Sequence, residues 1–502
     1  MAATITPPLT RRITIDPVTR LEGHGKIEIL LGENGEVDRV YFQVPELRGF
    51  EKFVQGRPAE AMPQITSRIC GVCPTAHHMA ATKALDQLFD VEPPQAARKI
   101  RELIYSTFMV EDHTLHFYFL GGPDFIVGPT APAPDRNVLG VIAKVGKETA
   151  QKVIDIRRKL RDLIALAGGK AIHPVFGIAG GISKPLAREE AAQFREVAAE
   201  AVEFARFTLA IFETMVLANS EYIELIKSDA FTHSTYYMGL VDRNNRVNFY
   251  DGVLRVVAPD GHEWARIDPG RYDSLIDEHT EPWSYMKFCH LKSIGWRGFQ
   301  DGPESGIYCV GPLARLNAAE GFATALAEEA YLQFFGTLGR PVHHTLATHW
   351  ARLVELLYAA ERMKQLAEDP EITDARVRVL PTAVPKEGIG VVEAPRGTLI
   401  HHYRSEPTGL ITKANLIVAT QNNAARISLS VEKAARALVS ASHVDSGILN
   451  MIEMAFRAYD PCLGCATHSL PGSMPLKVVV RDFRGVVQNS LKRDFDGSIH
   501  RE

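Results

Sequence analysis

The sequence has few cysteines, almost no net charge and no long apolar segment. Six cysteines among 502 residues are too few for a disulfide-stabilised scaffold. A net charge of −4 gives no electrostatic indication of binding to nucleic acid or to an anionic membrane. No apolar run reaches the roughly 18–20 residues of a membrane-spanning helix, and the segment MAATITPPLTRR lacks the apolar stretch of a signal peptide. These absences predict a cytoplasmic globular protein with no membrane span and no nucleic-acid partner.

Two kinds of hydrophobic periodicity divide the chain. The N-terminal part alternates apolar and polar positions around an ENG turn at 33–35, which predicts a β-hairpin within residues 12–45. Beyond it, apolar residues recur at i, i+3, i+4 and i+7, the spacing of helices. The helical segments lie at 93–120, 147–168, 188–226, 315–336 and 345–369.

Two stretches between the helical segments lack that period. Residues 229–310 are irregular, with one predicted strand at 245–257, and residues 380–420 mix short strands with loops. No repeat or low-complexity linker divides the chain. We therefore predict a mainly α fold, with a long helical bundle core and small peripheral sheets, in which residues 1–468 form a single unit.

Four of the six cysteines form two C-x2-C pairs, Cys70 with Cys73 and Cys462 with Cys465. Four thiolates suit a structural zinc site, so the residue types leave that interpretation open. Structural zinc pairs usually lie about 15–20 residues apart, whereas 388 residues lie between Cys73 and Cys462. The fold itself must bring such remote segments together, because closing so long a loop costs entropy. A site whose ligands come from both ends of the chain favours a catalytic role over a purely structural one. A cysteine-dependent redox or scaffold role is a further interpretation.

Four sequence blocks carry a resemblance to one family. They are DPVTRLEGH at 16–24, RICGVCPTAH at 68–77, EAPRGTLIHHY at 393–403 and DPCLGCATH at 460–468. Together they resemble the large subunit of nickel–iron hydrogenases. Within this family, the sequence is most similar to the cytoplasmic, cofactor-coupled branch. The methyl-viologen-reducing type that serves heterodisulfide reductase resembles it most, and the NAD-coupled bidirectional type is a near relative. The related quinone-binding subunit of respiratory complex I lacks the four thiolates, so their presence favours a hydrogenase.

The resemblance implies a nickel–iron centre held by the two cysteine pairs. Cys70, Cys73, Cys462 and Cys465 would bind nickel, and Cys73 and Cys465 would also bridge to an iron that carries one carbon monoxide and two cyanides. Soft thiolates suit both metals. The implied enzyme is an oxidoreductase that acts on hydrogen as donor, and its reaction is the reversible heterolytic cleavage of H2 to protons and electrons.

The resemblance also implies residues that act beside the metals. Cys462 would accept the first proton and Glu22 would relay it. Arg396, which follows Pro395 in the APRG block, would lie over the metals, and Thr420 would donate to a cyanide. From the residues alone, Glu22 would more often be a helix-capping or surface carboxylate, and Arg396 would be a surface arginine after a proline turn, so both roles rest on the resemblance.

Three further residues are implied to support this set. Asp112 and Asp460 would hold Arg396 in place, as residues behind a metal site commonly do. His77, four positions after Cys73, would donate to that bridging sulfur. A histidine satisfied within a helix is the alternative for His77.

A second cation is implied near the end of the family motif. Glu51 and His468 would bind magnesium, for which oxygen ligands are suitable. The alternative for Glu51, in RGFEKF, is an ion pair on a helix face. Cys289 and Cys309 have no ligand-like partner and are predicted to be buried as small apolar side chains.

The remaining implications concern partners and processing. With no cysteines left for iron–sulfur clusters, electrons would leave through a small subunit that holds such clusters, and from there to further flavin or iron–sulfur subunits. A maturation chaperone would assist metal insertion, and an endopeptidase would cut after His468, so residues 469–502 would be a propeptide. The alternative is a permanent C-terminal strand, because LKVVVRDFRGVV has strand character.

Overall fold

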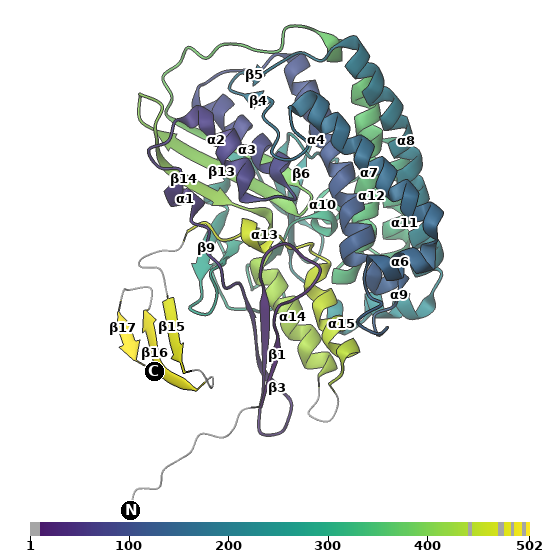
Figure 1. The fold of residues 1–502 in the computed structure, drawn as a ribbon, viewed down its shortest axis with the longest axis vertical. Coiled ribbons are helices and arrows are strands. Elements are labelled where there is room, and N and C mark those ends of the chain that lie inside the picture. The colour runs from purple at the N-terminus through teal and green to yellow at the C-terminus, as the bar shows by residue number, and fades with distance from the viewer. Residues whose placement is uncertain (1–10, 440–443, 470–475, 483–485, 494–497, 502) are drawn as a thin grey trace, which may run out of the picture.

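The structure, a computed structural model, describes residues 11–439, 444–469, 476–482, 486–493 and 498–501. Long helices form one side of the molecule and small sheets surround them (Figure 1). This arrangement confirms the predicted fold class. Within the described residues, no helix is both long enough and apolar enough to cross a membrane.

Helix α12 (Thr348–Glu368) is the centre of the helical body. Every residue from Thr348 to Ala360 is buried, whereas a surface helix buries only one stripe. It packs against α4 (Gln95–Leu115), α8 (Arg188–Phe212) and α11 (Ala325–Leu338), and α7 (Lys147–Gly168) packs against α4 and α8. The buried positions of α4 include Asp112 and His113, so the bundle carries polar residues into its interior.

The predicted helical segments are present, and two of them are divided. The segment 188–226 ends α8 at Phe212, continues as a π-helical turn over 213–217 and resumes as α9 (Ser220–Lys227). The segment 315–336 is split between α10 (Pro312–Ala318) and α11. Gly321 lies between them with φ of +148°, a backbone conformation that interrupts a helix and that L side chains rarely adopt.

The N-terminal sheet contains the predicted hairpin. Strands β1 (Arg11–Ile15), β2 (Lys26–Leu31) and β3 (Val37–Gln43) pair antiparallel in that order. Burial alternates along β2, as expected of a strand with one face on the core. Gly35 has φ of +78° in the turn that joins β2 to β3. The sheet extends below the helical body, beside α14 (Ala424–Leu438) and α15 (Ser446–Arg457) (Figure 1).

The middle of the chain contains more strands than predicted. A four-stranded sheet has the order β11-β6-β7-β8, and β9 pairs with β10. The strand predicted at 245–257 is wrong in its first half, since only Val253–Val257 is extended. The amides of Tyr250 and Asp251 donate to the side chain of Asn248 and form a turn instead. The bounds are β6 (Tyr236–Val241), β7 (Val253–Val257), β8 (Glu263–Ile267), β9 (Ile276–Thr280), β10 (Lys287–Leu291) and β11 (Tyr308–Cys309).

A three-stranded antiparallel sheet, β12 (Glu387–Ala394), β13 (Gly397–Ser405) and β14 (Ile411–Ile417), lies against α3 (Pro74–Leu88). Gly390 allows this close contact, because a Cβ there would collide with the carbonyl of Ala80. Ala394 pairs with Gly397, so Pro395 and Arg396 alone form the turn between β12 and β13. The sheet therefore presents Arg396 at the end of a tight hairpin.

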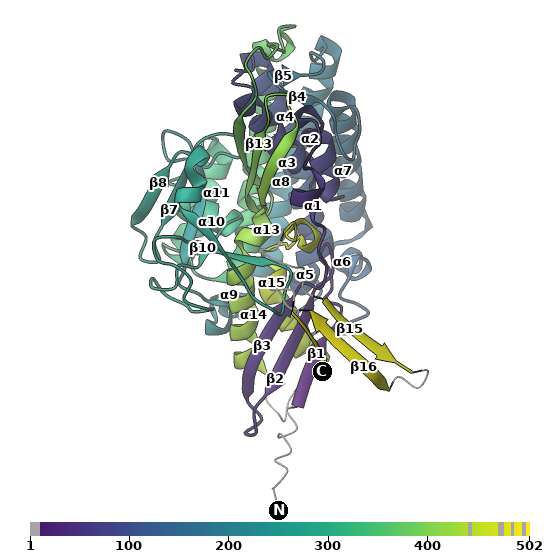
Figure 2. The same cartoon turned by 90° about the vertical axis from the view of Figure 1, so that its left-hand side faces the viewer.

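The chain returns to the body at its C-terminal part. Helix α13 (Ala419–Asn422), α14 and α15 lead to a short 3-10 turn at Leu463–Cys465. The chain then forms a separate sheet of β15 (Leu476–Arg481), β16 (Val487–Arg493) and β17 (Ile499–Arg501), which stands apart from the helical body in both views (Figures 1 and 2). The remaining elements are α1 (Phe50–Phe53), α2 (Met62–Thr66), α5 (Pro123–Ile126), α6 (Val138–Val145), β4 (Gly177–Ile178) and β5 (Gly181–Ile182).

Candidate metal centre

The fold brings both cysteine pairs to one buried position. Their ligand atoms all lie within 4.8 Å of one another. The Cys70 sulfur is 3.3 Å from that of Cys462, and the Cys73 sulfur is 3.7 Å from that of Cys465. Among the described residues this is the one group of three or more cysteine, histidine or acidic side chains arranged to hold a metal ion.

Each pair lies on a short turn at the edge of a helix or strand. Cys70 follows a 3-10 turn and Cys73 directly precedes α3, whose first residue is Pro74. The amides of Val72 and Cys73 donate to the Cys70 sulfur at 3.2 and 3.1 Å. These contacts stabilise negative charge on that sulfur, as a metal-binding thiolate requires.

The second pair follows a strained residue. Asp460 has φ of +54° although it is not glycine and precedes a proline. Such conformations cost about 1–3 kcal/mol and persist where the surroundings enforce them. Burial raises the pKa of the Cys462 and Cys465 thiols well above its ordinary value. Because several thiolates cannot stay charged together in a dry site without a cation, the donor set fits a soft metal.

Arg396 reaches from the β12–β13 hairpin to two acidic residues. Its Nε donates to the Asp460 carbonyl at 2.6 Å, and its Nη2 donates to the Asp460 carboxylate at 3.1 Å. Its Nη1 lies 3.4 Å from the Asp112 carboxylate. Burial raises the pKa of both acids, and Arg396 opposes that shift. The three residues predicted to act together are therefore adjacent, and although burial lowers the pKa of Arg396, the carboxylates of Asp112 and Asp460 raise it.

Glu22 lies against the second cysteine pair. Its Oε2 is 3.0 Å from the Cys462 sulfur and accepts a hydrogen bond from the Gly464 amide at 3.1 Å. Its Oε1 is 3.3 Å from Nη2 of Arg48, and Arg48 also donates to the Ile69 carbonyl, one residue before Cys70. The sequence did not indicate a role for Arg48, because its link between the two cysteine loops exists only in the folded chain.

Thr420 lies on α13 next to the same loop. Its hydroxyl oxygen accepts a hydrogen bond from the Cys462 amide at 3.0 Å. The hydroxyl hydrogen is left to donate elsewhere. The predicted donation to a cyanide stays a prediction.

His77 does not make the expected hydrogen bond to Cys73 among the described residues. Its Nδ1 lies 3.1 Å from Nε2 of His401, whose Nδ1 is 2.6 Å from the Tyr403 hydroxyl. Burial lowers the pKa of His77 to about 4, so this ring is neutral near pH 7. We did not predict a role for His401, although it lies in the block EAPRGTLIHHY. Its position on a paired strand is the feature that could have indicated one.

Glu51 and His468 lie in neighbouring segments. The Arg48 amide donates to the Thr467 carbonyl at 2.8 Å, and the rings of Phe50 and His468 meet edge to face at 5.7 Å. Burial raises the pKa of Glu51, which Lys287 opposes, and burial lowers the pKa of His468 to about 3. His468 is buried while the chain continues from it through Ser469.

Comparison with known proteins identifies the family. The family model described as nickel-dependent hydrogenase matches residues 48–144 and 303–468, which include all four clustered cysteines. The chain belongs to the nickel-dependent hydrogenase family. A second family model, described as HoxL-like, matches residues 12–47.

Three similar proteins indicate where this chain lies within that family. An iron-sulfur subunit of the F420-non-reducing hydrogenase of Archaeoglobus profundus is 44% identical over 484 residues, which cover 96% of this chain and 99% of that protein. The NAD-reducing hydrogenase HoxS subunit beta of Cupriavidus necator is 37% identical over 494 residues, which cover 95% and 98%. The crystal structure of an NAD+-reducing NiFe-hydrogenase in the H2-reduced state matches with a TM-score of 0.85 and 39% identity, over 91% of this chain and 100% of that one.

These findings confirm the predicted family, branch, fold class and enzyme class. The hydrogenase large subunit is the catalytic subunit of an oxidoreductase that acts on H2, and the four-cysteine cluster indicates a nickel–iron site. The structural zinc and redox-scaffold interpretations, which the cysteine spacing left open, are set aside by this membership.

Proposed function

We propose that this hydrogenase cleaves H2 heterolytically and reversibly at a nickel bound by Cys70, Cys73, Cys462 and Cys465. Cys73 and Cys465 would also hold the iron, which would carry one carbon monoxide and two cyanides. The observation that carries the proposal is the set of four buried sulfurs within 4.8 Å. When bound, a nickel–iron centre supplies the electrophile on which H2 is split.

The protein would move the proton from Cys462 to Glu22. The 3.0 Å contact between the Cys462 sulfur and Glu22 Oε2 is within proton-transfer distance. The Glu22 side chain is 20% exposed, so it can pass a proton outward. Arg48, whose Nη2 lies 3.3 Å from Glu22 Oε1, would stabilise the carboxylate form of Glu22 that accepts the proton.

Arg396 would provide a fixed positive charge beside the reacting atoms. Its contacts with Asp112 and Asp460 use all three guanidinium nitrogens and fix the direction of the group. In the same proposal, Thr420 donates to one cyanide, Pro395 fixes the turn that presents Arg396, and His77 supports the first cysteine pair.

Magnesium would bind near Glu51 and His468. The Glu51 carboxylate is a suitable hard ligand, and it accepts a hydrogen bond from the Leu416 amide at 2.9 Å. Lys287 is close enough to affect the pKa of both residues.

Electrons would leave to a small subunit that holds iron–sulfur clusters. Cys289 and Cys309, the two cysteines outside the site, are buried and belong to no group of three or more metal-ligating side chains among the described residues, so they do not provide a cluster site. Relatives are named as subunits of F420-non-reducing and NAD-reducing hydrogenases. We infer further flavin or iron–sulfur subunits, with the methyl-viologen-reducing type favoured by the 44% identity and the NAD-coupled type as second candidate.

Maturation would involve a chaperone and an endopeptidase that cuts after His468. The support is the separate sheet of β15–β17, whose strands pair with one another. The cytoplasm is the proposed compartment, because none of the six cysteines is in a disulfide, which suits a reducing environment.

Metal analysis with infrared spectroscopy tests the function. Purified, matured protein should contain nickel and iron and show bands of metal-bound carbon monoxide and cyanide. Zinc alone, or no such bands, would contradict it.

A further inference from the structure

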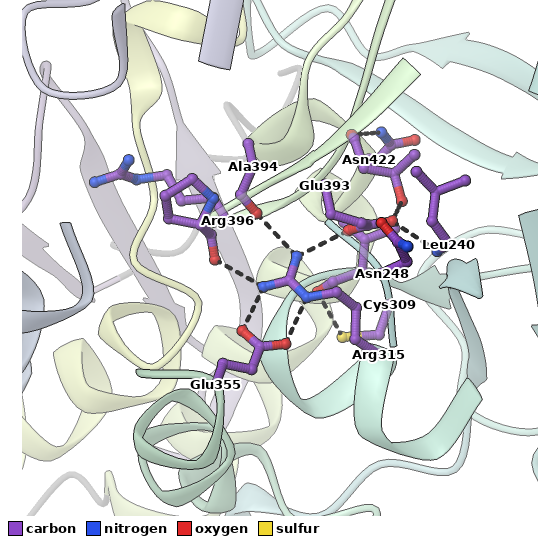
Figure 3. Close-up of polar contacts among 12 residues, drawn as sticks. Leu240, Asn248, Cys309, Arg315, Glu355, Glu393, Ala394, Arg396 and Asn422 are labelled. Carbon is purple, nitrogen blue, oxygen red and sulfur yellow. Dashed lines mark hydrogen bonds and ion pairs between the residues drawn. The ribbon is translucent and has the colours of Figure 1, made fainter. Parts of the chain in front are cut away.

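Arg315 is a fully buried arginine that uses all five of its N–H donors. It lies on α10, and its Nε and Nη2 donate to the two carboxylate oxygens of Glu355 on α12 at 2.5 and 2.6 Å. Its Nη1 donates to Glu393 on β12 at 2.8 Å. Figure 3 shows the guanidinium between these two carboxylates. An arginine offers five such donors and no acceptor.

The two remaining donors bind the backbone of the turn that carries Arg396. Nη1 of Arg315 donates to the Ala394 carbonyl at 2.8 Å (Figure 3), and Nη2 donates to the Pro395 carbonyl at 3.3 Å. Pro395 and Arg396 are the whole turn between β12 and β13. Because a two-residue turn has little conformational freedom, holding these carbonyls fixes where the Arg396 side chain begins.

The same cluster also reaches the counter-ion of Arg396. Glu355 Oε2 lies 3.2 Å from Nε2 of His113. His113 follows Asp112 on α4, and the Asp112 carboxylate is the one near Nη1 of Arg396. Arg315 is therefore linked to Arg396 through the backbone on one side and through α4 on the other.

Glu393 ties the cluster to two further strands. Its Oε1 accepts hydrogen bonds from the Leu240 amide of β6 at 2.9 Å and from the Thr398 hydroxyl of β13 at 2.8 Å. A Cβ at Gly311, which precedes α10, would lie 3.0 Å from the Arg396 carbonyl. The turn is thus enclosed on several sides.

Stability alone is a weak reason for such a cluster. Arg315, Glu355 and Glu393 are each completely buried, and apolar side chains of similar volume often stabilise a core as well as a buried ion pair does. What apolar side chains cannot do is hold two carbonyl oxygens in place. The directional bonds to Ala394 and Pro395 are the feature that only an arginine supplies here.

We propose that Arg315, supported by Glu355 and Glu393, is a positioning residue that sets the Arg396 guanidinium toward the cysteine sulfurs. Arg315 acts through Arg396, and all its donors are used within the cluster. The inference rests on the proposed function in one respect, namely that Arg396 lies beside the reacting atoms.

The test compares Arg315→Lys with Arg101→Lys in the purified holoenzyme. Arg101 is an equally buried arginine that pairs with Asp86 and with the carbonyls of Ile178 and Gly181, away from the Arg396 turn. Arg315→Lys should lower the H2 oxidation rate per nickel about 10- to 100-fold, as expected from a misplaced group, and shift the cyanide infrared bands. Arg101→Lys should lower the melting temperature while the rate per nickel and the bands stay unchanged.

Three results would overturn the proposal. One is a normal rate per nickel and unshifted bands in Arg315→Lys. Another is that the losses of H2 oxidation rate in Arg315→Lys and Arg396→Lys add up in the double variant. If both residues act through one group, Arg315→Lys should cause little further loss of rate in an Arg396→Lys background. The third is unchanged hydrogen exchange at amides 396–398 in Arg315→Lys, where we expect faster exchange than in Arg101→Lys.

Two further points keep the outcomes distinct. If Arg315→Lys does not fold, Glu393→Gln removes one charge with little change of shape and should affect the same readouts in the same direction. If the wild-type protein lacks H2 activity and the infrared bands, the proposed function fails, whereas the exchange at amides 396–398 still decides the role of Arg315.

Discussion

Glu22 Oε2 lies 3.0 Å from the Cys462 sulfur, although 440 positions separate the two residues in the sequence. The contact does not depend on the side chains alone, since the Leu463 amide donates to the Glu22 carbonyl at 2.9 Å. The two segments form an isolated parallel bridge at this point. The backbone thus sets the distance across which a proton would move.

Glu22→Gln should abolish most of this transfer without loss of the metal site. The amide can still accept from Gly464, but it cannot take a proton, so H2 oxidation should fall about 10²- to 10⁴-fold at unchanged nickel content. Glu102→Gln, at a partly buried glutamate paired with Arg362, is the control and should keep the wild-type rate. A Glu22→Gln enzyme with full nickel and full activity would refute the proton role.

Cys465→Ser should abolish H2-dependent dye reduction and reduce the iron content. A hard hydroxyl is a poor substitute for a bridging thiolate on soft metals. Cys289→Ser is the matched control, because Cys289 is equally buried and lies outside the four-sulfur cluster. Retained activity in Cys465→Ser would disprove the assigned bridge.

Acid should destabilise the protein through its buried neutral histidines. His78 Nδ1 lies 3.1 Å from the Pro63 carbonyl and Nε2 accepts from the Gly177 amide at 2.8 Å, so protonation of Nε2 would break a hydrogen bond. Burial lowers the pKa of His78 from 6.5 to about 4. The unfolded chain therefore binds the proton first, and stability on the order of 3 kcal/mol is lost as the pH falls from about 6.5 to 4.

Urea unfolding between pH 7.5 and 5 measures this effect. His78→Gln keeps an acceptor for Gly177 and should show a smaller loss of unfolding free energy over that range than the wild type. Equal slopes for the wild type and His78→Gln would contradict the assignment.

The active enzyme should end at His468. Intact-mass measurement of the matured protein should give a chain without residues 469–502, while a precursor produced without the endopeptidase should keep them and contain little nickel. The structure brings the four cysteines together with Ser469 attached, so the tail does not by itself prevent the cluster from forming. A fully active chain that ends at Glu502 would rule out removal.

The sequence was informative where spacing alone defines a feature. The two C-x2-C pairs predicted a shared site, and helical periodicity located the helices around α12. The ENG turn predicted the β2–β3 hairpin. Each of these signals lies within a short segment or a motif, so it can be recognised without knowledge of the fold.

Other features depend on contacts that no local pattern specifies. Strand β7 was predicted too long because Asn248 forms a side-chain turn. Arg48 and Arg315 resemble ordinary arginines in the sequence, and their roles follow from carbonyls supplied by remote loops. The contact of His77 with His401 joins α3 to β13, and no local pattern specifies it, while the expected donation of His77 to the Cys73 sulfur stays a prediction.

Diffraction from crystals of the matured enzyme at the nickel and iron absorption edges would locate both metals in the protein. We expect a nickel peak among the sulfurs of Cys70, Cys73, Cys462 and Cys465, with an iron peak on the side of Cys73 and Cys465. A zinc peak at that position, or nickel bound elsewhere, would contradict it.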